Sequence, residues 1–125
     1  MLSRKAVVQL AMGDLKHLVL AKFKEGVPVE DLIKGMERLA TDMEAVKGFE
    51  WGQDSVSEVA LRQGYTHVFI LTFKSAEDFA AFSAHPTHLE FAANFAAGIE
   101  SILVFDFPSV LIKPSNAAAA AAAPA

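Results

Sequence analysis

The sequence of 125 residues contains no cysteine, so it excludes a disulfide framework, a thiolate metal site and a cysteine nucleophile. It also lacks an excess of basic charge, because 11 Lys and Arg against 15 Asp and Glu give a net charge of -4. A chain without a basic stripe does not attract phosphate backbones, so we expect no nucleic-acid partner. No apolar run reaches the roughly 20 residues that span a bilayer, so we expect a soluble protein that does not bind membranes.

The two ends of the chain differ in composition from the segment between them. Residues 1–15 begin with a basic, mildly amphipathic stretch, which we interpret as a flexible leader. Residues 114–125 are mostly alanine, have only methyl groups to bury, and are expected to form a disordered tail. We therefore predict a single domain at 16–113 in a cytoplasmic protein, with import into an organelle as the alternative.

The spacing of apolar residues changes several times along the predicted domain. Alternation of side chains between two faces indicates strands, and apolar residues three and four positions apart indicate helices. The expected elements are a strand at 16–24, a helix at 28–48, strands at 49–57 and 64–74, helices at 75–84 and 86–98, and a strand at 101–113. Ser75 and Asp78 have the spacing of a capping box. This order predicts an α+β, ferredoxin-like protomer: an antiparallel four-stranded sheet with its helices on one face.

The expected sheet has apolar side chains on both of its faces. In the first strand, Leu18 and Leu20 lie opposite Val19 and Ala21, but the helices can cover only one side. A bare apolar face of this size exceeds what soluble monomers tolerate. We therefore infer a homodimer in which two sheets pack face to face. The expected seam contains Leu18, Val68, Ile70 and Phe105.

Three of the four histidines are expected to converge on the helix-covered side of the sheet. Residues two positions apart in a strand point to the same face, so His17 and His67 are expected to point the same way as Val19 and Phe69. His88 lies on the same face of its helix as Phe91 and Phe95. An apolar pocket with a few polar groups is the usual form of a small-molecule site, and a neutral imidazole can act as a base. A structural role is the competing interpretation, because buried histidines often bond to backbone carbonyls.

The predicted pocket combines these histidines with apolar side chains from the strands and helices. Its lining is expected to be His17, Val19, Ala21, Leu32, Ile33, Met36, His67, Phe69, Phe82, Phe91, Ile102 and Val104. Tyr65 is the only phenol, and its parity with His67 makes it a second catalytic candidate beside His88. No spacing such as HExxH brings the histidines together as metal ligands, so we predict neither a metal nor another cofactor.

The chain resembles the stress-responsive dimeric A/B-barrel (Dabb) family in five segments. They are KHLVLAKFK, WGQD, GYTHVFILTFKS, AHPTHLEFA and LVFDF, in this order, between about residues 16 and 113. The family includes plant heat-stable stress proteins and a polyketide cyclase. The resemblance implies a ferredoxin-like protomer and a dimeric α+β barrel made from two sheets. It does not imply an activity, because many members have no assigned chemistry.

The resemblance also suggests a role for His88 within HPTH, because this position matches the base of the family's polyketide cyclase. A tyrosine assists that base in the cyclase, and the matching residue here is Phe82, which has no hydroxyl group.

The sequence supports two candidate functions. The first is a stress-response homodimer that holds an unknown apolar small molecule in the histidine pocket. The alternative is a cofactor-independent polyketide cyclase, in which His88 removes a proton alpha to a carbonyl and directs an intramolecular aldol closure. Whether the chain is an enzyme stays open.

Overall fold

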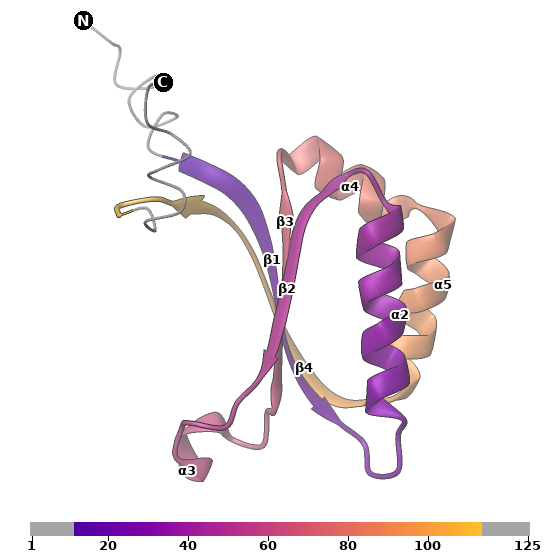
Figure 1. Ribbon diagram of the computed structural model, residues 1–125, viewed down its shortest axis with the longest axis vertical. Helices are drawn as coiled ribbons and strands as arrows, with labels where there is room; N and C mark the ends of the chain where they lie inside the picture. The colour runs from indigo at the N-terminus through magenta and orange to yellow at the C-terminus, as the bar shows by residue number, and fades with distance from the viewer. Residues whose placement is uncertain (1–11, 114–125) are drawn as a thin grey trace, which may run out of the picture.

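The computed structural model describes residues 12–113, which form one four-stranded antiparallel sheet with its helices on one side (Figure 1). The strands are β1 (Met12–Phe23), β2 (Val46–Gln53), β3 (His67–Phe73) and β4 (Ile99–Val110), in the spatial order β2-β3-β1-β4. β1 and β4 are paired along most of their length and curve away from the other strands at one end (Figure 1). This arrangement confirms the predicted ferredoxin-like fold.

Three helices, α2 (Val29–Asp42), α4 (Ala76–Ala84) and α5 (Pro86–Ala97), form the layer that covers one face of the sheet (Figure 1). The predicted cap of α4 is present, because Ser75 Oγ accepts the backbone N–H of Asp78 at 3.1 Å. α5 begins at a proline, and His85 Nδ1 accepts the backbone N–H of Thr87 at 3.1 Å. None of the helices within residues 12–113 is long and apolar enough to cross a membrane.

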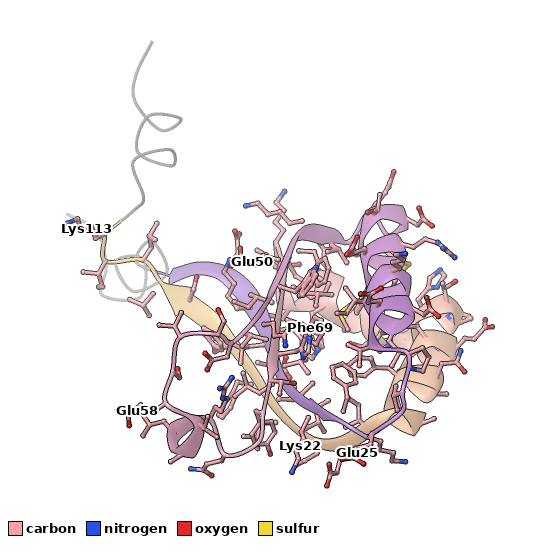
Figure 2. All side chains as sticks on the ribbon, turned by 60° about the horizontal axis from the view of Figure 1, so that its bottom comes forward. Lys22, Glu25, Glu50, Glu58, Phe69 and Lys113 are labelled. Atoms are coloured by element: carbon pink, nitrogen blue, oxygen red, sulfur yellow. The ribbon has the colours of Figure 1, made fainter. Side chains whose placement is uncertain are left out.

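The core lies between the sheet and the helix layer. Phe69 and Phe73 of β3 are completely buried there, and Figure 2 shows Phe69 between the strands and α2. Ile33 and Met36 of α2 pack in the same cluster as Phe69. Burying a side chain of this size contributes about 1.5–3 kcal/mol. The helix layer is therefore held to the sheet mainly through the inward side chains of β1 and β3.

The boundaries predicted for several helices and strands were wrong. The helix predicted at 28–48 stops at Asp42, because Met43 is extended and Val46 already pairs with Phe73 in the sheet. β1 begins at Met12, where it pairs with Val110, so residues 12–15 belong to the sheet rather than to a leader. The remainder of the predicted leader and the alanine-rich tail lie outside the described residues and stay predictions.

A short helix, α3 (Val59–Arg62), interrupts the loop between β2 and β3 and was not predicted. Asp54 starts this loop: its carboxylate accepts the backbone N–H groups of Ser57 at 2.9 Å and Val56 at 3.0 Å. These two bonds lower the pKa of the Asp54 carboxyl group. The Arg62 guanidinium donates to the Asp54 carbonyl at 2.8 Å and closes the loop. The loop lies on the side of the sheet away from the helix layer (Figure 1).

The face of the sheet opposite the helix layer is apolar, as the alternation predicts. Leu18 pairs with Ile70 and with Phe105, and the neighbouring Leu20 pairs with Val68 and with Leu103. We call this surface the open face. Its apolar residues are Leu18, Leu20, Val68, Ile70, Leu103, Phe105 and Phe107, and Lys16 and Thr72 pair in the row of Phe107 on the same face. On its β4 side the exposed fractions are 43% for Leu103 and 53% for Phe105, so large apolar side chains meet solvent in a single protomer.

Candidate functional site

A cavity of about 390 Å³ lies between the helix layer and the sheet. The sheet side contributes His17, Val19, Leu71, Ile99, Ile102 and Val104, and the helices contribute Met36, Leu39, Phe82, His88, Phe91, Ala92, Phe95 and Ala96. Among residues 12–113, two histidines are therefore the only polar side chains in an otherwise apolar lining. A cavity with this lining is the usual form of a site for apolar small molecules, which a few polar atoms can orient.

The cavity exists because the helix layer leaves β4 partly uncovered. Ile102 and Val104 pair with Ala21 and Val19 and point toward the helix side. They nevertheless remain 42% and 46% exposed, whereas Val19 is buried. The facing positions of α5 carry small residues, which leave space beside the edge strand. The cavity is thus bounded by β1 and the helices and is open along β4.

His88 is held at the cavity wall by α4 and α5. Its Nδ1 lies 3.0 Å from the carbonyl oxygen of Ser83, and a carbonyl can only accept, so Nδ1 carries the proton. Its ring packs on Phe82, with 4.5 Å between the ring centroids. Nε2 is then the acceptor nitrogen of a neutral ring. The contact with the Ser83 carbonyl is what a structural role of His88 requires, and it leaves Nε2 without this backbone partner.

His17 reaches the same cavity from β1. Its Nδ1 bonds to Oδ1 of Asp106, the residue directly across from it on β4. The ring of Phe79 lies edge-on to the imidazole, with the centroids 5.1 Å apart. Asp106 was not predicted as a site residue. It follows Ile102 and Val104 at intervals of two, so the alternation could have placed it on the same side of the last strand.

The structure brings only some of the predicted pocket residues together. Those that line the cavity are His17, Val19, Met36, Phe82, His88, Phe91, Ile102 and Val104. Ala21, Ile33 and Phe69 lie instead in the solid core, and Leu32 packs against that core. The lining residues not predicted for the pocket are Leu39, Leu71, Ala92, Phe95, Ala96 and Ile99. Ala92 and Ala96 follow His88 at intervals of four, a helical spacing that could have identified them.

His67 does not join the other two histidines. It pairs with Ala21, four positions along β1 from His17, which corresponds to about 13 Å along a strand. Its ring stacks with those of Trp51 and Phe69, with centroids 6.2 Å away in each case, and its Nδ1 lies 2.8 Å from the hydroxyl oxygen of Thr66. The predicted convergence of three imidazoles is therefore wrong, because shared parity fixes the face of a sheet but not the distance along it.

Tyr65 also lies away from the cavity. It precedes β3, and its hydroxyl group is 2.8 Å from Oγ of Ser101, at the end of the sheet where β4 begins. The cavity lining does not include it. Tyr65 therefore does not replace the phenol that Phe82 lacks. Within residues 12–113 there is also no group of three His, Asp or Glu side chains placed to hold a metal ion.

Burial of His67 makes the stability of the fold depend on pH. The side chain is 7% exposed, and burial lowers the pKa of its imidazole below the usual 6.5. As pH falls, the unfolded chain binds this proton before the folded chain does. The contribution to stability is complete above about pH 6.5 and is lost as pH falls from there through the lower folded pKa. We expect the urea midpoint of the parent to fall between about pH 7.5 and pH 5, and to fall less in His67→Phe. An equal decrease in both proteins would contradict this assignment.

The sheet order, the one-sided helix layer and the apolar cavity define a small α+β protein of the ferredoxin-like class. Residues 15–109 match the family model of the Stress Responsive A/B Barrel Domain, and the chain belongs to this family.

A stress-response A/B barrel domain-containing protein of Arabidopsis thaliana is 45% identical over 106 residues, which cover 85% of this chain and 96% of that protein. Olivetolic acid cyclase of Cannabis sativa is 32% identical over 96 residues, which cover 74% of this chain and 94% of the cyclase. The crystal structure of At3g17210 from Arabidopsis thaliana is similar with a TM-score of 0.72 and 44% identity, and the match covers 80% of this chain and 99% of that chain.

Proposed function

We propose that this stress-response A/B barrel protein is a homodimer that binds a small apolar molecule in the cavity between its helices and β4. The observation that carries the proposal is the cavity itself. Its volume of about 390 Å³ is within the range of roughly 300–1,000 Å³ that is typical of small-molecule sites. Of the described residues that line it, only His17 and His88 have polar side chains. The ligand is therefore expected to be mostly apolar, with few polar groups.

The open face supports the homodimer. Its side chains come from three neighbouring strands, and the register places them in adjacent rows. Soluble monomers rarely expose an apolar patch of this extent. A second copy offers the same surface, so two open faces can cover each other around a two-fold axis. The cavity lies on the opposite side of the sheet, so the dimer leaves the ligand site separate from the seam.

Ligand binding is tested by thermal unfolding with butylbenzene as an apolar probe. At ten times the Kd, mass action stabilises the folded state by about 1.4 kcal/mol, which raises the Tm by about 5–10 °C in a domain of this size. We expect Ala92→Leu to fill the cavity and abolish most of this shift. Ala93→Leu is the matched control, because Ala93 is the next residue of α5, is exposed and does not line the cavity. Equal shifts in the two variants would argue against binding at this site.

A polyketide cyclase activity is the second candidate. The observations that favour it are the 32% identity to olivetolic acid cyclase and the anchoring of His88 Nδ1 to the Ser83 carbonyl, which makes Nε2 the acceptor nitrogen when the ring is neutral. Such a base could remove a proton alpha to a carbonyl without a cofactor. Phe82 packs directly on His88 and has no hydroxyl to share the proton. For this reason we place ligand binding first.

A further inference from the structure

We propose that His17 and Asp106 form a polar anchor in the cavity that selects ligands with a neutral hydroxyl group on an apolar body. This inference rests on the proposed ligand-binding function and specifies the chemical class of the ligand. The anchor is a pair of residues that face each other on two adjacent strands: His17 on β1 and Asp106 on β4.

The position of the His17 ring is fixed from two directions. Asp106 holds Nδ1 from the β4 side, and the Phe79 ring of α4 packs edge-on at 5.1 Å between centroids. The His17 side chain is 20% exposed and lines the cavity, whereas Asp106 is 45% exposed and is not part of the lining. The imidazole therefore meets a bound molecule, and the carboxylate acts through the imidazole. Asp106 is a positioning residue.

The carboxylate also determines what the ring can offer to a ligand. An ionised carboxylate can only accept a hydrogen bond, so Nδ1 of His17 must donate to it. In a neutral ring, Nε2 then has no proton and accepts. His88 has the same arrangement, because its Nδ1 donates to the Ser83 carbonyl. In their neutral forms, both imidazoles in the cavity thus present an acceptor nitrogen.

A cavity with two acceptor nitrogens distinguishes among small molecules of similar shape. The hydroxyl of a phenol or an alcohol donates to Nε2 and satisfies it. The corresponding methyl ether has no donor and leaves the nitrogen desolvated without a partner, which is costly in an apolar site. An ionised carboxylate would face the lone pairs and the nearby negative charge of Asp106. The expected order of affinity is the phenol first, then the ether, then the carboxylate.

The test compares three probes of matched shape: 4-butylphenol, 4-butylanisole and 4-butylbenzoate. Titration calorimetry on the full chain is expected to give a Kd for the phenol about five- to tenfold below that of the anisole, the difference that one hydrogen bond provides. His17→Phe should reduce this ratio at least threefold, because it keeps a flat ring and removes the acceptor. Asp106→Asn should reduce it as well and improve the relative binding of the benzoate. Asp14→Asn is the control, because Asp14 pairs with Lys47 at 2.8 Å and does not line the cavity.

Nitrogen-15 NMR of the histidine rings provides a readout that stability does not affect. The parent should show His17 with a protonated Nδ1 and an unprotonated Nε2, and the phenol should shift the Nε2 signal. A protonated Nε2 in the parent, or an unchanged phenol-to-anisole ratio in His17→Phe, would overturn the anchor. Equal affinity for phenol and anisole would also overturn it while leaving ligand binding intact. Failure of every probe to bind would contradict the proposed ligand-binding function itself, and the anchor with it.

Discussion

Val68→Asp is expected to convert the dimer into a monomer or an aggregate at concentrations where the parent is dimeric. Val68 is on β3, and its partner on β1 is Leu20, so its side chain lies within the open face. In the proposed dimer an aspartate there would be buried without a partner charge, at a cost of several kcal/mol. Light scattering after size-exclusion chromatography measures the mass of both proteins directly.

Two further variants make this result interpretable. Leu89→Asp makes a similar apolar-to-acidic change on α5 in the helix layer, where Leu89 is 55% exposed, and it should leave the dimer intact. Leu103→Glu changes an open-face residue that is already 43% exposed in one protomer, so it should give a folded monomer. Circular dichroism establishes that each variant is folded. A parent that is monomeric, or a Val68→Asp protein that stays dimeric, would contradict the proposed seam.

The sequence predicts the architecture well where the signal is local. Alternation placed Val19 and Ala21 on the helix side of β1 and Leu18 on the open face, and the register confirms both assignments. The Ser75 cap is similarly local, because the residue that accepts the bond is three positions from the residue that donates it. Patterns of this kind depend on the geometry of one element and need no knowledge of the remainder of the fold.

Boundaries were less predictable where tertiary pairing decides the conformation. Met43, Ala45 and Val46 carry apolar side chains that suit the end of a helix and the start of a strand equally well. Pairing of Val46 with Phe73 selects the strand. The four-residue helix α3 depends on the carboxylate and carbonyl of Asp54, and its sequence has no apolar stripe that would have indicated a helix.

The candidate site required information about distance that periodicity does not contain. His17 and His67 share a face, but His67 is in the last pair of the β1–β3 register, across from Ala21, whereas His17 is four positions away along β1, across from Leu71. Asp106 and His17 are 89 positions apart in the chain and become neighbours only through the register of β1 and β4. The position of the cavity depends in turn on how far the helix layer extends over β4, which is a property of packing between elements.

Substitution of His88, the candidate base, gives the other large expected effect. If the protein is a polyketide cyclase, His88→Ala should reduce cyclisation of a linear poly-β-keto thioester by about 10²–10⁴-fold, the usual contribution of a general base. Phe82→Tyr should create or raise this activity, because it adds a phenol to the ring that packs 4.5 Å from the imidazole. A product assay by liquid chromatography and mass spectrometry measures ring closure in both variants and in the parent.

Phe49→Tyr is the matched control for the added hydroxyl. Phe49 lies on β2, is half-buried and is not in the cavity lining. A gain of activity in Phe82→Tyr alone would therefore require the phenol to act beside His88. A purely structural His88 predicts a different outcome, because its bond to the Ser83 carbonyl would be lost in His88→Ala. Stability would then decrease by about 1–3 kcal/mol, and ring closure would be the same in every variant. That combination would exclude the cyclase and leave the cavity as a binding site whose histidines only orient the ligand.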